Sequence, residues 1–259
     1  MKYCMSGRHS TIALREADEI KMKYVDKERA IDFIKEYPEK TIIIEIPKDV
    51  DMIDWTLLDA YNDAATIVLC LYDLRHVDEC VEHNMKFYWA YPITSYYELK
   101  GIMELKPYYL LLGAPLCFDL EAIHQKTGIY IRLVANIAYE AYIPRKDGIC
   151  GQWIRPEDVK YYEPYVNAIE FVGVDLTAEK TLVKIYKNDQ EWPGNLNALI
   201  KNLNYDVDSR ALPDEFGQLR VRCGQRCMSI GTCHYCQSAF IFANKIRDTY
   251  NEMQQKKEN

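Results

Sequence analysis

Apolar runs alternate with amphipathic stretches along most of this chain. Eight runs of apolar, β-branched and aromatic residues are typical of β-strands, and the middle ones begin roughly 20 to 25 residues apart. That interval is about the length of one strand plus one crossover helix. The runs are Lys2–Met5, Glu19–Val25, Thr41–Ile46, Thr66–Tyr72, Lys86–Tyr91, Tyr108–Gly113, Ile129–Ala135 and Ala168–Gly173. The pattern therefore predicts a series of β-α units.

The stretches between these runs have the polar and apolar spacing of surface helices. Asp26 and Ser95 stand where helix N-caps are expected, because a short polar side chain there can accept a hydrogen bond from the first turn. The predicted helices are Asp26–Tyr37, Asp51–Asp63, Ser95–Leu105 and Pro115–Thr127.

Two runs, Thr41–Ile46 and Thr66–Tyr72, are almost continuously apolar, as expected of parallel strands covered on both faces. Repeated β-α units of this kind form either an open doubly wound sheet or a closed (β/α)8 barrel. The count of eight favours an α/β fold of the TIM-barrel type, and no glycine-rich phosphate loop follows the first run. The alternative is an open sheet of five or six strands with a separate N-terminal hairpin.

The rhythm changes after Asp175, which predicts a barrel over residues 1–176 and a C-terminal extension over residues 177–259. In the extension, Thr181–Tyr186 has the composition of an extra strand and Pro193–Leu203 that of a helix. A last helix is expected from about Ser238, with apolar residues at spacings of three and four.

Composition limits the class of protein. The chain has 259 residues, 49% of them hydrophobic, and a formal net charge of −7. The acidic balance argues against an extended nucleic-acid interface, although a local basic patch is compatible with it. No run of eighteen apolar residues occurs, so no membrane span is predicted. The N-terminus lacks the apolar core of a signal peptide, and we expect a cytoplasmic protein. The oligomeric state is not predicted.

The strongest chemical signal is a run of four cysteines, Cys223, Cys227, Cys233 and Cys236, spaced C-x3-C-x5-C-x2-C. Four thiolates can surround one zinc ion or one iron–sulfur cluster. Zinc sites usually separate their two cysteine pairs by a dozen or more residues, whereas only five separate them here. The spacing favours a 4Fe–4S cluster, with zinc as the main alternative and redox-active thiols as another. Arg220, Arg222 and Arg226 would balance the negative charge of such a site.

Chemistry in a barrel is expected at the carboxyl ends of its strands, which form the mouth. Polar residues placed there include Arg8, His9, Glu45, Asp73, Tyr91, Asn136 and Asp175. We take Glu45, Asp73 and Asn136 as candidates for binding a small-molecule substrate.

A long loop, Pro144–Asp158, follows the Ile129–Ala135 run and carries Trp153 and Arg155. As a lid over the mouth, this loop would let Trp153 stack on a ligand and Arg155 grip a carboxylate. The alternative is a structural flap that closes the barrel.

The segments Ile154–Glu163 and Ala168–Gly173, followed by the cysteine cluster, resemble the barrel portion of the collagenase-like peptidase family, family U-32. The resemblance extends over Thr41 to Phe240. That family also includes iron–sulfur proteins implicated in the hydroxylation of RNA bases and quinone precursors. The resemblance implies a cluster-binding barrel with a redox or hydroxylation-type activity on an unidentified substrate. Family members draw their cysteines from well-separated parts of the chain, whereas here they form a single run.

Two other functions remain open. In one, zinc fastens the extension to the barrel of a binding or structural protein without catalysis. The other is proteolysis, which ranks lowest because four thiolates leave no open position for water and the sequence lacks His-Glu-x-x-His. The sequence does not identify catalytic residues.

Overall fold

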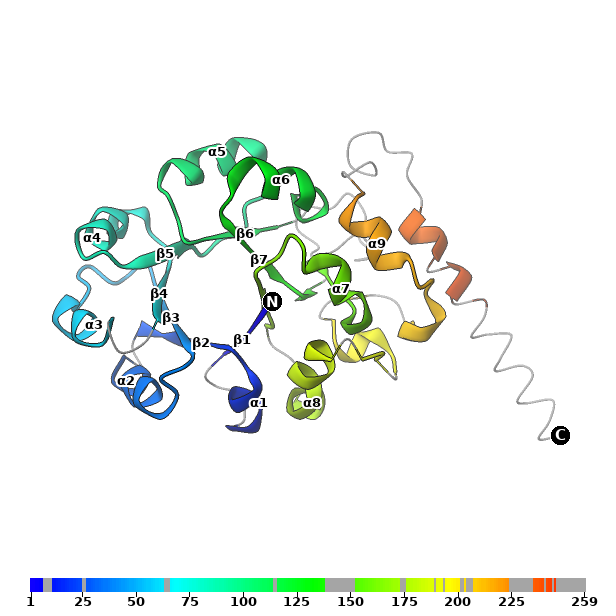
Figure 1. Cartoon of the computed structure of the whole chain (residues 1–259), viewed down its shortest axis with the longest axis horizontal. Helices are drawn as coiled ribbons and strands as arrows, with labels where there is room; N and C mark the ends of the chain where they lie inside the picture. Colours follow the sequence, from blue (N-terminus) through cyan, green and yellow to red (C-terminus); the bar gives the residue numbers. More distant parts are fainter. Residues whose placement is uncertain are drawn as a thin grey trace.

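Eight parallel strands close into a barrel in the computed structural model of this protein (Figure 1). The structure describes residues 1–6, 11–24, 27–62, 66–113, 116–137, 152–172, 176–188, 190–192, 194–200, 203, 207–223, 235–239, 241–243 and 245. The barrel strands are β1 (Lys2–Ser6), β2 (Glu19–Lys23), β3 (Thr41–Ile46), β4 (Thr66–Leu71), β5 (Lys86–Trp89), β6 (Tyr109–Leu112), β7 (Tyr130–Val134) and β10 (Ala168–Glu170). Strand β10 pairs with both β7 and β1, which closes the ring.

Helices ring the barrel, one after each of its strands (Figure 1). They are α1 (Thr11–Glu16), α2 (Lys27–Glu36), α3 (Trp55–Asn62), α4 (Val77–Glu82), α5 (Tyr96–Glu104), α6 (Leu120–Thr127), α7 (Val159–Tyr162) and α8 (Leu176–Lys187). Fully described 3-10 helices include η2 (Leu74–His76) before α4, η3 (Leu116–Phe118) before α6 and η4 (Pro156–Asp158) before α7. The predicted (β/α)8 barrel is confirmed, and the open-sheet alternative is wrong.

The predicted start of α5 is also confirmed. Ser95 has an extended backbone, and its side chain accepts a hydrogen bond from the Glu98 backbone nitrogen while Glu98 bonds back to the Ser95 nitrogen. This reciprocal capping box satisfies two donors that the first turn would otherwise leave without partners. The other predicted cap, Asp26, lies outside the described residues.

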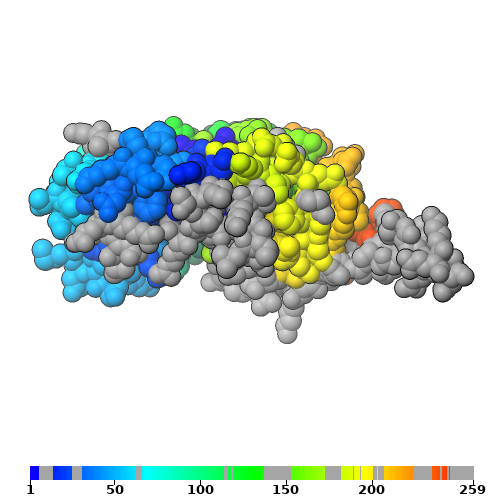
Figure 2. Space-filling model, turned by 90° about the horizontal axis from the view of Figure 1, so that it is seen from below, coloured from blue at the N-terminus to red at the C-terminus, as the bar shows by residue number. Residues whose placement is uncertain are grey.

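The predicted strand Thr181–Tyr186 is wrong, because these residues form the second half of α8. Leu182, Val183 and Tyr186 are buried on one helical face, and the Tyr3 hydroxyl donates to the Tyr186 carbonyl. Packing of this face outweighs the strand preference of its β-branched residues. Figure 2 shows the N-terminal part of the chain (blue) beside the yellow part near residues 180–200. The ring thus continues to Lys187, past the boundary predicted at residue 176.

The helix predicted over Pro193–Leu203 is also wrong. Of the proposed helix Pro193–Leu203, the described residues form only a 3-10 turn, η5 (Leu196–Ala198), capped by the side chain of Asn195. A second turn, η6 (Ser209–Ala211), follows, and then helix α9 (Phe216–Val221). Helix α9 lies outside the ring beside α7 (Figure 1). Residues 235–239 and 241–243 are helical, so the last helix begins before Ser238. The later part of the predicted helix, from residue 246 on, lies outside the described residues.

Two apolar clusters form the core. The larger lies between the strands and the surrounding helices, and the smaller fills the barrel lumen with residues such as Cys4, Val68, Tyr88 and Leu111. Among the described residues, no helix is long and apolar enough to cross a membrane.

Candidate functional site

Four charged side chains are buried in the barrel lumen and bond to one another. Arg132 of β7 donates from Nη1 to Oε2 of Glu19 at 2.5 Å and from Nε to Oε2 of Glu170 at 3.0 Å. The other oxygen of Glu170 accepts from Nζ of Lys21 at 2.8 Å. Tyr109 adds a hydroxyl donor to Glu19 at 2.7 Å. The network therefore joins strands β2, β6, β7 and β10 through the centre of the barrel.

The strand period places these charges inside. Glu19 and Lys21 alternate in β2 with Ile20 and Met22, which are buried in the cluster beneath the helices. Side chains at odd and even positions of a strand point to opposite faces, so one set must enter the lumen. A charge enclosed there needs a partner of opposite sign, which each of these residues has.

The network extends toward the mouth through Glu45, near the carboxyl end of β3. Its Oε1 lies 3.2 Å from Nζ of Lys21 and accepts a hydrogen bond of 3.0 Å from the hydroxyl of Tyr72, which follows β4. The side chain of Glu45 is 23% exposed, whereas that of Lys21 is 13% exposed. A small polar molecule entering the mouth would meet this carboxylate, ammonium and phenol first.

Electrostatics keep this cluster charged. Burial opposes the charge on Lys21, but Glu170 and other neighbours prevail and hold the pKa of Lys21 well above its ordinary value. Burial would raise the pKa of Glu170, yet Lys21 and Arg132 lower it to about 2. Burial, followed by the charge of Glu45, raises the pKa of Tyr72 above its ordinary value. Lys21 therefore stays protonated at neutral pH, which suits it to binding or stabilising negative charge rather than to nucleophilic attack.

Two polar atoms in the lumen have no hydrogen-bond partner among the described residues, Nη2 of Arg132 and the hydroxyl of Tyr88. The guanidinium carbon of Arg132 lies 5.3 Å from the centre of the Tyr88 ring. Buried polar atoms in this situation commonly bond to internal water. Burial also raises the pKa of the nearby Cys70 thiol to about 11 against the influence of Lys21, so this thiol is protonated at neutral pH.

Of the predicted substrate-binding residues, Glu45 lies in this cluster, whereas Asp73 makes local contacts. Asp73 caps η2 by accepting from the backbone nitrogen of Arg75 at 2.9 Å, and it pairs with Nε of the same arginine at 2.8 Å. The hydrogen bond from the Arg75 backbone lowers the pKa of Asp73. Desolvation opposes this effect, and the side chain of Arg75 adds to it. The contacts of Asp73 are therefore those of a residue that caps a helix.

Asn136 is buried at the seam between β7 and β10. Its side-chain amide donates to the carbonyl of Val172 and its side-chain oxygen accepts from the nitrogen of Val172, both at 2.9 Å. Asn136 also belongs to the short antiparallel pair β8 (Asn136–Ile137) and β9 (Gln152–Trp153). These bonds give Asn136 a structural role at the mouth, and substrate binding by it stays a prediction.

The expectation that Arg155 grips a ligand is not supported by its contacts. It is 2% exposed, donates to both oxygens of Asp158 at 2.6 and 2.8 Å, and bonds to the carbonyls of Ser209 and Pro213. The guanidinium thus joins the barrel to the extension. Of the proposed lid, residues 144–151 lie outside the described residues.

Trp153 is likewise buried, at 1% exposure, and stacks on Phe216 of α9 with ring centres 5.5 Å apart. Phe216 stacks in turn on Tyr235 at 6.0 Å. Nη1 of Arg220 donates to the Trp153 carbonyl at 2.9 Å. Trp153 therefore anchors the extension, and the expected stacking on a ligand is not supported by this geometry.

The two outer cysteines of the run, Cys223 and Cys236, are described, whereas Cys227 and Cys233 are not. Both described cysteines are half-buried against the main core. Cys223 follows α9, and Cys236 follows Tyr235, whose ring packs on the same helix. Cys223 thus lies just after the last residue of α9, whereas the residue before Cys236 packs on the first residue of this helix. Within the described part of the chain, no group of three or more potential metal ligands occurs.

A fifth cysteine, Cys117 of η3, lies in the same neighbourhood. Burial raises the pKa of its thiol to about 12, Arg220 opposes the increase, and Cys223 adds to it. Burial likewise raises the pKa of Tyr162, and both Cys117 and Cys236 contribute to the increase. Cys117 and Cys236 therefore lie close enough to influence Tyr162, and Cys223 lies close enough to influence Cys117.

Comparison with known proteins does not show a family for this chain. No protein-family model matches the sequence, and neither does any curated protein. A phosphoribosyl anthranilate isomerase in complex with reduced 1-(o-carboxyphenylamino)-1-deoxyribulose 5-phosphate is 13% identical, with a TM-score of 0.49 over 73% of this chain and 99% of that chain. The Thermotoga maritima phosphoribosylanthranilate isomerase is 14% identical, with a TM-score of 0.48 over 72% and 98%.

A 4-hydroxy-2-oxoglutarate aldolase is 11% identical, with a TM-score of 0.44 over 72% of this chain and 92% of that chain. All three similarities are too low to support a shared activity.

Sequence reasoning did not select Lys21, Tyr72, Arg132 or Glu170. The available signal was the alternation of charged and apolar residues within Glu19–Lys23 and Tyr130–Val134. In strands covered on both faces, a charged residue at alternate positions indicates a polar partner inside the barrel.

Proposed function

We propose that this protein is an iron–sulfur barrel protein whose C-terminal extension binds a 4Fe–4S cluster through Cys223, Cys227, Cys233 and Cys236. The observation that carries the proposal is that Cys223 follows α9, while Tyr235, which precedes Cys236, stacks on Phe216 of the same helix. Both cysteines are also partly buried against the main core. Four cysteines within fourteen residues can supply all the thiolate ligands of a single cluster.

The surroundings suit a negatively charged group. Four thiolates around an oxidised 4Fe–4S core carry a net charge near −2. Burial raises the pKa of the nearby Cys117 thiol, and the positive charge of Arg220 partly offsets this increase. The half-buried sulfurs of Cys223 and Cys236 provide soft ligands that are partly shielded from solvent. When bound, the cluster would supply electron transfer, and these residues would hold it between α9 and the barrel.

The test is anaerobic purification followed by measurement of iron, acid-labile sulfide and the absorption near 400 nm. We expect about four irons per chain and a brown protein. Cys227→Ser and Cys233→Ser should each lose most of the iron. Cys80→Ala is the matched control, because Cys80 is buried in α4 outside the run, and it should keep its iron. Full iron content in both serine variants would contradict the proposal.

Zinc is the second candidate, and the junction between barrel and extension favours it. The stack of Trp153, Phe216 and Tyr235, together with the contacts of Arg155, makes the extension a docked part of the molecule that a structural metal could fasten. Coupling of metal binding to folding can contribute about 10 kcal/mol. If the purified protein is colourless and holds one zinc per chain, and the Cys227→Ser variant loses that zinc, the site is a zinc site and not a cluster site.

The barrel mouth is the place we propose for a small polar substrate, in a redox or hydroxylation-type reaction of the kind that the resemblance to the collagenase-like peptidase family implies. Lys21, Glu45 and Tyr72 support this because they combine charge with partial exposure at the strand ends. Once a substrate is found, Glu45→Gln should weaken its turnover at least tenfold while leaving iron content unchanged. A normal rate in that variant would place the reaction elsewhere.

A further inference from the structure

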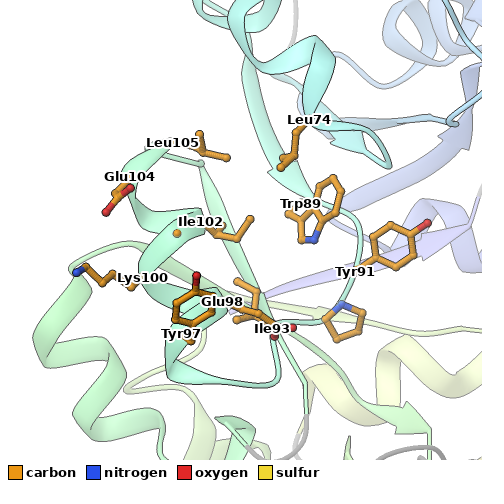
Figure 3. Close-up of a pocket in the computed structure, with 12 residues that line it drawn as sticks. Leu74, Trp89, Tyr91, Ile93, Tyr97, Glu98, Lys100, Ile102, Glu104 and Leu105 are labelled. Atoms are coloured by element: carbon orange, nitrogen blue, oxygen red, sulfur yellow. The ribbon is translucent and has the colours of Figure 1, made fainter.

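A pocket of about 570 Å³ opens between β5 and α5 (Figure 3), and no cysteine is among the residues that line it. Its walls are mainly apolar and include Leu74, Trp89, Tyr91, Tyr97 and Ile102. Pockets of this size usually hold a small molecule rather than a protein segment. The pocket is also where exposed apolar residues gather, since Tyr97 is 90% exposed, Leu74 45% and Tyr91 40%. Such a concentration commonly marks a binding site.

Three aromatic side chains from β5, the loop after it and α5 surround the pocket. Trp89 ends β5, Tyr91 follows it, and Tyr97 lies in the first turn of α5. The rings of Trp89 and Tyr91 are 5.2 Å apart and tilted, so they present two faces at an angle. In Figure 3, Tyr97 lies across the pocket from Tyr91. A flat ring inserted between them would contact aromatic surface on more than one side.

A glycine inside α5 supplies an independent observation. Gly101 lines the pocket, and a Cβ built at this position would meet no other atom within 4 Å. Its backbone is helical and has no positive φ, so neither backbone conformation nor packing within the chain requires glycine. Glycine in a helix interior is nevertheless destabilising relative to alanine. Since the fold does not require glycine at position 101, we infer that its missing side chain leaves room for a ligand.

The charges around the pocket indicate the kind of ligand. Nζ of Lys48 lies 5.2 Å from the centre of the Tyr91 ring, and Lys100 lines the wall. The carboxylate of Glu98 is occupied, because it accepts from Thr94 and Ser95 in the cap of α5. Glu104 is at the end of the pocket away from Tyr91 (Figure 3). Those donors are neutral, so Glu98 keeps its negative charge, and Lys48 places a positive charge beside the Tyr91 ring.

We propose that this pocket binds a small planar aromatic molecule carrying an anionic substituent, with the ring between Trp89 and Tyr97 and the anion toward Lys48. Tyr91 also connects the pocket to the mouth, because its ring meets that of Tyr72 edge-on at 5.4 Å. The proposal does not depend on the identity of the metal at the cysteine run.

Two fluorescent probes of similar shape test the proposal, the anionic 8-anilinonaphthalene-1-sulfonate and the neutral N-phenyl-1-naphthylamine. We expect saturable binding of the anionic probe at about one site per chain. Tyr97→Ala should weaken it about three- to tenfold, the loss expected for one aromatic contact. Tyr130→Ala is the matched control, since Tyr130 is exposed in β7 and does not line the pocket. Equal effects of the two substitutions would overturn the proposal.

Gly101→Leu separates binding from stability. Because Gly101 lines the pocket, we expect a leucine there to fill part of it and abolish probe binding, while the melting temperature should stay the same or rise by about 1 to 4 °C. Gln125→Leu, at an exposed site in α6, controls for added leucine and should bind the probe normally. Probe binding retained in a folded Gly101→Leu protein would show that the pocket is not the site.

The charge assignment has its own test. Lys48→Met should weaken binding of the anionic probe by at least threefold and leave binding of the neutral probe unchanged. If binding of both probes weakens equally, the ligand does not need an anionic substituent. A second copy of the chain is the competing occupant. Self-association that Tyr97→Ala abolishes, without saturable probe binding to the wild-type protein, would assign this face to that copy instead.

Discussion

The ammonium nitrogen of Lys21 lies 2.8 Å from Oε1 of Glu170, so that a side chain of β2 is held by a side chain of β10 across the intervening strand β1. The same carboxylate binds Arg132 of β7 through its other oxygen at 3.0 Å. Glu170 is thus the shared anion of two buried cations. Its position at the closing strand makes the ring of eight strands depend on electrostatic as well as apolar contacts.

Replacement of Glu170 by Gln should lower the free energy of unfolding by about 3 kcal/mol, because Lys21 and Arg132 would remain buried with one negative partner fewer. Denaturant titration at pH 7 measures the change. Glu16→Gln is the control, since Glu16 pairs with Lys184 at the surface at 3.3 Å and should cost less than about 1 kcal/mol. If the two variants lose similar amounts of unfolding free energy, the buried contacts of Glu170 contribute no more stability than a surface ion pair.

Acid should destabilise the protein through Glu170. Its pKa is lowered from 4.5 to about 2 in the folded protein, so the folded state binds this proton less tightly than the unfolded chain. The resulting stability is fully present above about pH 4.5 and is lost as the pH falls toward 2. The loss should be on the order of 3 kcal/mol, as a shift of this size implies. Denaturant titrations from pH 7 to pH 3 should show this decline, and it should be weaker in the Glu170→Gln variant.

Two glycine-to-alanine substitutions should have opposite effects. A Cβ at Gly217 of α9 would lie 2.6 Å from Oδ1 of Asp158, so Gly217→Ala should displace that carboxylate from Arg155 and cost about 2 to 4 kcal/mol. Gly101→Ala meets no neighbour and should stabilise the protein by about 0.5 to 1 kcal/mol. Thermal unfolding compares the two. Stabilisation by both would contradict the close contact between α9 and η4.

If the cysteine run binds a metal as proposed, metal removal should loosen the extension before the barrel. The segment around Cys236 would then lose a covalent link to Cys223, while packing such as the stack of Tyr235 on Phe216 would remain. Hydrogen exchange after chelation should therefore increase in residues 216–223 and 235–245, while β3 and β4, which are almost completely buried, stay protected. Faster exchange spread evenly over the whole chain would argue against a local role for the metal.

The sequence by itself determined the barrel strands and the cap of α5. Continuous apolar runs such as Thr41–Ile46 must be covered on both faces, and Ser95 three residues before Glu98 is a local hydrogen-bonding pattern. Both features depend on neighbours in the chain. The spacing of the cysteine run is local in the same sense, and its assignment to a cluster or to zinc stays a prediction.

Only the tertiary structure decided which polar residues meet. Lys21 and Glu170 are 149 positions apart and become partners because the ring closes between β10 and β1. The helix at Thr181–Tyr186 and the burial of Arg155 have a similar origin, since surfaces distant in sequence supply their contacts. Hydrophobic periodicity specifies which face of a segment is buried. It does not specify which distant partner covers that face, because this depends on how all eight strands pack together.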